Sequence, residues 1–201
     1  MKSYDSVLKE ACREASSFFG ITQDIKLEVV NSIEELSRKL KVDITKIPWY
    51  AVGFHKGNKV LILSYRLFSK RGHKKSEFKR VILHEVCHIF LKKIIKKEIP
   101  VWIAEGLCQY ISFGDLNIKP KKYVELKHLR TYKDWYKYDS PYAYCSSFFS
   151  YLNKKFGKRK ILKFINLLKR FDQKRAFKKA FNEELSLEES RFRKKLNEEA
   201  I

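Results

Sequence analysis

The sequence predicts an α+β fold, in which a small N-terminal sheet and a buried helix precede a helical C-terminal lobe. Two β-prone runs, residues 50–54 and 59–63, flank the segment His55-Lys56-Gly57-Asn58, which is a hairpin signal. Residues 77–97 form a strongly apolar stretch without Gly or Pro, which is typical of a buried helix. Nothing in the 201 residues is rich in Pro, Gly or Ser, so we expect one domain, 1–201, with lobes 1–97 and 98–201.

Ahead of the hairpin we expect an amphipathic helix, a strand and a second helix, at Ser3–Phe19, Ile25–Val30 and Ser32–Leu40. Ser32 can cap the second helix, because Glu34 and Glu35 then fall in its first turn. After the apolar helix, Pro100 closes the segment and residues 101–111 read as another helix.

The C-terminal half begins with an irregular, Lys- and Tyr-rich stretch over residues 114–141. Three helices are then expected, at Tyr142–Phe156, Arg159–Phe171 and Lys174–Phe181. Ser186 and Glu189 have the spacing of a capping box, which predicts a last helix up to about Glu199.

The run His84-Glu85-Val86-Cys87-His88 carries the chemistry. Two histidines four positions apart lie on one face of a helix, so both imidazoles can bind one ion. Glu85 is turned to the side of that ion, where it can take a proton from a metal-activated water and deliver it to a leaving amine. A catalytic zinc ion has three protein ligands and an open position, and Glu105 is the best candidate for the third ligand.

These residues, together with Trp102-Ile-Ala-Glu105-Gly106-Leu-Cys-Gln-Tyr110, resemble the gluzincins, and most of all the small peptidase-MA-like domains. The resemblance covers roughly residues 76–196. It implies a zincin-like fold, one Zn²⁺ per chain bound by His84, His88 and Glu105, and a zinc metallopeptidase with Glu85 as general base and then general acid. No acidic motif for a substrate amino terminus precedes the zinc helix, so endopeptidase action is expected.

Two features depart from the wider group. Where thermolysin-type gluzincins have an Asp four positions after the glutamate ligand, this chain has Gln109, whose amide oxygen can still accept from an imidazole as an outer contact of the metal site. Cys87 and Cys108 stand beside the ligands, where buried small apolar residues would serve, and we expect both to be buried.

The resemblance also suggests how substrate is handled. A tyrosine in the segment 142–151 would donate to the oxyanion; we expect Tyr144, with Tyr142 as the substitute. The edge strand of the sheet would pair with the extended substrate, and the expected strand is Val60-Leu61-Ile62-Leu63-Ser64. An ordinary structural strand remains the alternative.

The formal net charge is +21, from 44 basic and 23 acidic residues. The positive charge is dispersed along the chain and no nucleic-acid motif is present, so either a solvated surface or weak electrostatic contact with nucleic acid would explain it. The alternative function is therefore a basic binding module for nucleic acid or protein on a catalytically inactive zincin scaffold. Self-cleavage or another amide hydrolysis is a third reading.

The four cysteines do not make a disulfide framework. The N-terminus lacks the apolar core of a signal peptide, and no stretch reaches the length of a membrane span. We therefore expect a cytoplasmic protein. A peptidase in that compartment would need a narrow substrate range, restricted access or a controlling partner.

Overall fold

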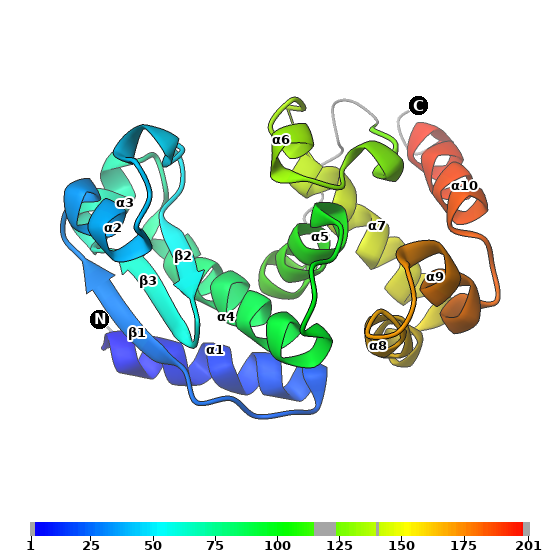
Figure 1. Ribbon diagram of the computed structural model, residues 1–201, viewed down its shortest axis with the longest axis horizontal. Coiled ribbons are helices and arrows are strands. Elements are labelled where there is room, and N and C mark those ends of the chain that lie inside the picture. Colours follow the sequence, from blue (N-terminus) through cyan, green and yellow to red (C-terminus); the bar gives the residue numbers. More distant parts are fainter. Residues whose placement is uncertain (1–2, 115–123, 140, 199–201) are drawn as a thin grey trace. The chain divides into compact units, whose positions relative to one another are not determined.

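The computed structural model describes residues 3–114, 124–139 and 141–198. The chain divides into two compact units, Met1–Phe90 and Leu91–Ile201. The first unit holds a three-stranded sheet with helices, and the regular elements described in the second unit are all helical (Figure 1). This confirms the predicted α+β class, while the expectation of a single domain stays a prediction.

The sheet has the strand order β1-β3-β2, and its strands are β1 (Lys26–Val30), β2 (Gly53–Lys56) and β3 (Lys59–Leu63). β3 pairs in parallel with β1 and in antiparallel with β2, so both of its edges are occupied. The expectation that residues 60–64 form the substrate-pairing edge is therefore wrong, because a strand paired on both sides cannot add a third neighbour. Among the described strands, β2 and β1 are the edges.

The β2–β3 hairpin confirms the turn signal in the sequence. Lys56 pairs with Lys59, and Gly57 between them has φ +59°, a conformation that glycine adopts readily. Strand β2 begins at Gly53 rather than at Tyr50, because residues 48–51 form a turn in which the Ala51 amide donates to the Pro48 carbonyl at 3.0 Å.

Helices α1 (Tyr4–Phe19) and α2 (Ile33–Leu40) match their predicted bounds and are capped by Ser3 and Ser32. The sequence analysis did not predict α3 (Tyr65–Lys70) or the short 3-10 turns η1 (Ile44–Lys46) and η2 (Lys75–Glu77). Each is only one or two turns long, too short to show helical periodicity.

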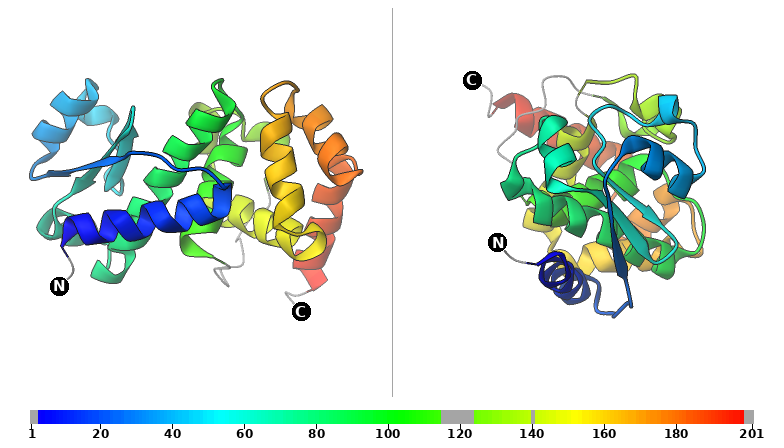
Figure 2. Two further views of the ribbon diagram at one scale, coloured as in Figure 1. Left: turned by 90° about the horizontal axis from the view of Figure 1, so that it is seen from below. Right: turned by 90° about the vertical axis from the view of Figure 1, so that its left-hand side faces the viewer.

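Helix α4 (Phe78–Ile95) carries the two histidines and crosses the boundary between the units. Within the first unit it lies beside α1, because Tyr4 packs on Phe78 at one end and Phe19 stacks on Phe90 at the other. Figure 2 shows α1 as a straight helix along this side of the first unit. The helix ends two residues earlier than the apolar run suggested, since Lys96 adopts a positive φ of 54°.

The second unit begins with the end of α4, and the helices that follow are α5 (Val101–Phe113), α6 (Tyr132–Trp135), α7 (Pro141–Phe156), α8 (Lys158–Leu167), α9 (Gln173–Phe181) and α10 (Leu185–Glu198). The segment expected to be irregular contains α6 and the 3-10 turn η3 (Leu126–His128), and residues 115–123 and 140 of it lie outside the described residues. Helix α8 ends four residues before the expected Phe171, and Asp172 caps the next helix.

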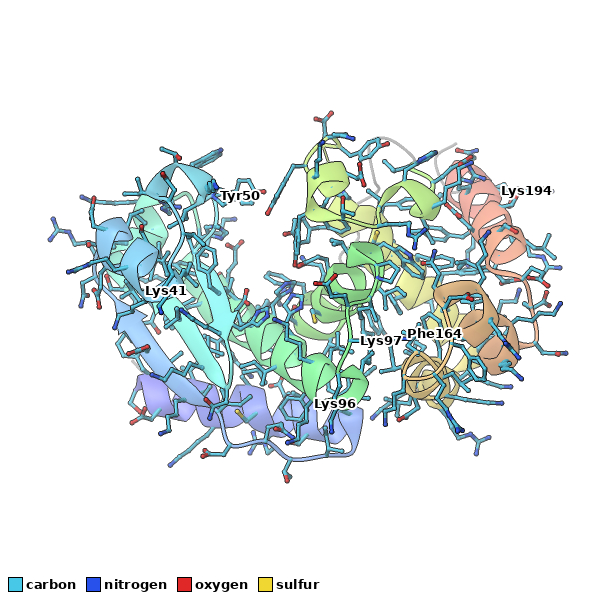
Figure 3. All side chains as sticks on the ribbon, viewed as in Figure 1. Lys41, Tyr50, Lys96, Lys97, Phe164 and Lys194 are labelled. Carbon is cyan, nitrogen blue, oxygen red and sulfur yellow. The ribbon has the colours of Figure 1, made fainter. Side chains whose placement is uncertain are left out.

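Trp102 organises the core of the second unit. It is fully buried and stacks on Phe149 and Phe164, and its indole nitrogen donates to Gln173 at 2.7 Å. Phe164 is labelled in Figure 3 among these helices. Burying this much aromatic surface fixes the start of α5, the helix that carries Glu105.

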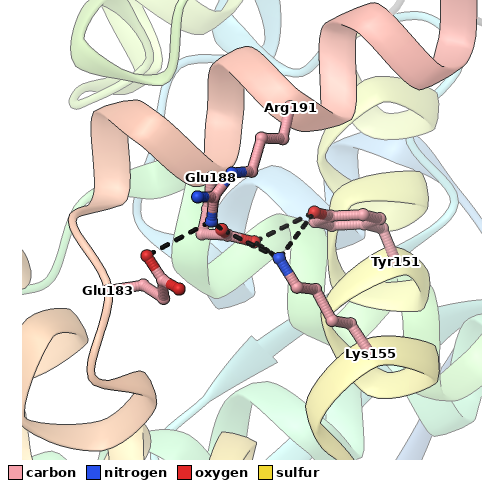
Figure 4. A network of polar contacts seen from close by, with 5 residues as sticks. All are labelled: Tyr151, Lys155, Glu183, Glu188 and Arg191. Carbon is pink, nitrogen blue, oxygen red and sulfur yellow. Dashed lines mark hydrogen bonds and ion pairs between the residues drawn. The ribbon is translucent and has the colours of Figure 1, made fainter.

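A polar network joins α10 to α7 (Figure 4). Glu188 has no exposed side-chain surface and accepts from Tyr151 at 2.9 Å and from Lys155 and Arg191. The predicted capping box of Ser186 and Glu189 is wrong, because α10 begins at Leu185 and Glu189 instead accepts from the Leu126 amide at 2.8 Å. Its predicted end at Glu199 lies outside the described residues.

Candidate active site

The two imidazoles of α4 converge as their spacing predicts. The Nε2 atoms of His84 and His88 lie 3.1 Å apart, and His88 is 5% exposed. Two nitrogens bound to one tetrahedral ion at about 2.0–2.1 Å would lie roughly 3.3 Å apart. The pair is therefore arranged as two nitrogen ligands of one metal ion would be.

Glu85 is held beside these imidazoles by a residue that the sequence analysis did not assign to the site. Its carboxylate Oε2 lies 2.9 Å from Nδ1 of His55 on β2, and the His55 ring stacks on His88 with centroids 4.9 Å apart. The side chains of His55 and Glu85 are 14% and 11% exposed, so the hydrogen bond is sheltered from water. Strand β2 thus supplies a fourth polar residue to this part of the site.

Gly53 explains how β2 can come this close to α4. A Cβ atom at Gly53 would lie 2.5 Å from Cγ1 of Val81 and 3.2 Å from Cγ of Glu85. The missing side chain is therefore a steric requirement of the contact between strand and helix. It also places His55, two residues along the strand, within reach of Glu85.

The surroundings of Glu85 favour its ionised form. Burial raises the pKa of its carboxyl group, but the hydrogen bond with His55 and the charges of the neighbouring imidazoles lower it. The balance lies below the ordinary value of 4.5. An ionised carboxylate is the form that a general base requires.

Glu105 lies in the second unit on α5 and is 4% exposed. The hydroxyl of Tyr132 donates to its Oε1 at 2.5 Å, a charge-assisted hydrogen bond that orients the carboxylate. The next residue, Gly106, lets α5 lie against α7, since a Cβ there would lie 2.6 Å from Cβ of Cys145. His84, His88 and Glu105 form a group that could hold a metal ion.

The remaining predicted residues have separate outcomes. Gln109 is half-buried one turn after Glu105, and its outer contact with the metal site stays a prediction. Cys87 and Cys108 are fully buried, as expected.

Tyr144 is better explained as a core residue than as an oxyanion donor. It is fully buried, and its hydroxyl lies 3.5 Å from Glu189 of α10. Burial first, and Glu189 second, raise the pKa of its hydroxyl well above the ordinary value. The proposed substitute, Tyr142, packs edge-on against Trp135. The described tyrosine contact with Glu105 comes from Tyr132, which lies in the stretch that we expected to be irregular.

None of the helices in the described part of the chain is both long and apolar enough to span a membrane.

Residues 3–187 match the model of a family described as BSP, peptidase of plants and bacteria. A relative from Bacillus subtilis (strain 168), "Uncharacterized protein YhcO", is 31% identical over 132 residues, covering 59% of this chain and 41% of the relative. The chain thus spans about two-fifths of the length of that curated relative. No solved structure gives a significant match. Because the family model matches nearly the whole chain, this protein belongs to the BSP family of peptidases of plants and bacteria.

Proposed function

We propose that the protein is a zinc-dependent metallopeptidase of the gluzincin type, with His84, His88 and Glu105 as the zinc ligands. The observation that carries the proposal is the placement of Glu85, an ionised and nearly buried carboxylate, beside the paired imidazoles of α4. Two imidazoles and a carboxylate are a ligand set of catalytic zinc sites. Membership of a peptidase family implies a peptide or protein substrate.

When bound, zinc would supply Lewis-acid polarisation of the substrate carbonyl and lower the pKa of water at the site. The chain's own residues handle the protons. Glu85 accepts one from the attacking water at its carboxylate and later donates it to the nitrogen of the leaving amine. His55 holds that carboxylate in place through Oε2, so that the other oxygen, Oε1, can face the water.

Tyr132 has a corresponding role for Glu105. Its hydrogen bond to Oε1 restrains the carboxylate rotamer, as outer-shell partners of metal ligands commonly do.

The role of substrate-pairing strand, which we expected for β3, is assigned here to β2. Strand β2 is an edge of the sheet, and it carries His55 in contact with the catalytic carboxylate. An extended peptide added to this edge would place its backbone next to Glu85. Binding along a strand does not require a substrate terminus, which agrees with endopeptidase action.

The first experiment measures the zinc content of the purified chain and the activity of Glu85→Gln on an unfolded protein substrate. About one zinc per chain and cleavage lost in Glu85→Gln, with zinc retained, would support the proposal. Glu98→Gln is the matched control, because Glu98 is an exposed glutamate between α4 and α5. Absence of zinc after supplementation, or equal cleavage by both variants, would refute it.

A second candidate function, a basic nucleic-acid-binding surface, is favoured by one specific observation. Residues 154–179 contain twelve lysines and arginines and a single acidic residue, Asp172. All twelve cations are exposed except Lys160, which is half-buried. None of the large apolar side chains exposed in the described part of the chain falls in this segment, so it offers little for insertion into a bilayer.

Binding of a labelled DNA duplex at increasing salt tests this candidate. Replacing Lys163, Lys169, Arg170 and Lys174 by Glu should weaken binding strongly and flatten its salt dependence, because each lost phosphate contact removes about 0.9 from the slope. The control carries the same charge change in the first unit, at Lys9, Lys41, Lys46 and Lys70. Equal losses in both variants would show only a general electrostatic effect.

A further inference from the structure

The turn before β2 presents two aromatic side chains to solvent. Trp49 is 73% exposed, the largest exposed fraction among the large apolar residues of the described chain, and Tyr50 is 38% exposed. Their rings meet edge to face with centroids 6.0 Å apart. Tyr50 is labelled in Figure 3 at the surface of the first unit. Tryptophan and tyrosine are the residue types that dominate binding surfaces, since they offer a large rigid apolar area with few rotatable bonds.

The backbone of this turn is held by side-chain hydrogen bonds. Nη1 of Arg71 donates to the carbonyls of Pro48 at 2.8 Å and Ala51 at 3.0 Å. Nε2 of His73 donates to the carbonyl of Tyr50 at 2.8 Å. Three of the four carbonyls in the turn are thus held by side chains of the segment after α3. A platform that is already ordered loses little conformational entropy when a ligand binds.

The turn runs directly into β2, the strand that carries His55. The amide of Leu63 on β3 donates to the Val52 carbonyl at 2.9 Å, and the next residue, Gly53, begins β2 against Glu85. Trp49 and His55 are six residues apart, a span of at most about 20 Å. A peptide of roughly ten residues lying along β2 could therefore reach both the catalytic carboxylate and the aromatic turn.

We propose that Trp49 and Tyr50 form a binding site for a large apolar side chain, such as Phe or Leu, of a peptide that lies along β2. The site rests on the proposed peptidase function, because the ligand is the substrate itself. It adds a specificity element at a distance from the scissile bond. A surface that takes one apolar side chain should give a preference of roughly 10-fold over a polar one.

The fluorescence of Trp49 can report on binding, because the other two tryptophans, Trp102 and Trp135, are buried. The zinc-loaded Glu85→Gln chain is titrated with unstructured peptides of about ten residues, in which a single Phe is moved through an otherwise polar sequence. Phe at one particular position should shift tryptophan emission to shorter wavelength and protect it from acrylamide, and an all-polar peptide should do neither. Trp49→Ser should abolish the signal.

The same change is then followed in the active enzyme, by mapping the cuts made in an unfolded protein. Wild type should show large apolar residues enriched at a fixed distance from the cut, and Trp49→Ser and Tyr50→Ser should lose that enrichment. The control, Leu187→Ser, removes a 45%-exposed apolar residue of α10 and should keep it.

The outcomes separate the two proposals. A fluorescence response without any cleavage by wild type would support peptide binding at the turn but refute the peptidase, and with it the claim that the bound peptide is a substrate. Cleavage without an apolar preference, or Phe peptides that leave Trp49 unchanged, would overturn the binding site alone. An emission shift that depends on protein concentration, without peptide, would assign the turn to a contact between copies of the chain and would also overturn it.

Discussion

Replacing Gly53 by Ala tests whether the contact between β2 and α4 sets the geometry of the Glu85 carboxylate. The added Cβ would lie 2.5 Å from Cγ1 of Val81, more than 1 Å inside ordinary van der Waals separation, and 3.2 Å from Cγ of Glu85. Overpacking of this kind costs about 1–3 kcal/mol, offset by roughly 0.4–1 kcal/mol because alanine restricts the unfolded chain. The expected net loss of stability is therefore about 1–2 kcal/mol.

The matched change is Val81→Ala, which removes Cγ1 from the contact. Alone it should cost about 1 kcal/mol, since Val81 is half-buried. In the double variant the severe overlap is gone, so the free energies of unfolding should combine to a loss smaller than their sum by about 1 kcal/mol. The contact with Glu85 remains. Catalytic turnover should therefore be low in Gly53→Ala and stay low in the double variant, which should be no less stable than Gly53→Ala.

Urea unfolding followed by circular dichroism measures the stabilities, and cleavage of an unfolded protein measures turnover. Additive losses in the double variant, within about 0.5 kcal/mol, would show that Gly53 and Val81 do not meet as described. Recovery of turnover in the double variant would show that the strand does not act through Glu85.

Three further predictions concern other contacts. Gly106→Ala should destabilise the chain by about 1–3 kcal/mol in thermal unfolding, because its Cβ would meet Cβ and the backbone carbonyl of Cys145, which cannot rotate away; an unchanged melting temperature would contradict the close approach of α5 and α7. His55→Ala should lower kcat roughly 10- to 100-fold with zinc content unchanged, and His55→Asn should recover part of it; a change in KM alone would argue against a positioning role. Glu188→Gln should cost about 1–3 kcal/mol near neutral pH. Burial raises the pKa of Glu188, but Lys155, Arg191 and Tyr151 lower it to below its ordinary value. The difference from wild type should thus be full above about pH 5 and shrink as the pH falls through the folded-state pKa, and a difference that grows in acid would reverse this sign.

Local signals explain which elements the sequence could predict. Ser32 caps α2 because its hydroxyl accepts from the Glu35 amide, which is only three residues away. The same pattern at Ser186 and Glu189 failed, because Glu189 accepts from an amide 63 residues away. A capping box is read from short separations alone, so it cannot reveal that a tertiary partner has taken the carboxylate.

The prediction of the edge strand was wrong for a related reason. Residues 59–63 were correctly predicted as a strand, but the family resemblance led us to expect residues 60–64 at the edge of the sheet. Four of the five are buried, as expected for a central strand covered on both faces. Strand order depends on the parallel pairing of β1 with β3, a crossover that hairpin signals do not encode.

In the candidate site, too, the residues close together in sequence were predicted and the distant one was not. The spacing of His84, Glu85 and His88 is a helical property, so the sequence alone placed them on one helix and the structure brings the two ring nitrogens to 3.1 Å. His55 stands 30 positions before Glu85, in a segment whose only visible signal was a turn. One retrospective clue existed, the glycine two residues earlier in a β-prone run, since glycine inside a strand often marks a close approach of backbone to another group. That clue indicates that something lies against the strand. It does not say that the neighbour is the carboxylate of Glu85, and this is why Gly53 and His55 have to be tested together with Glu85 as one packed contact.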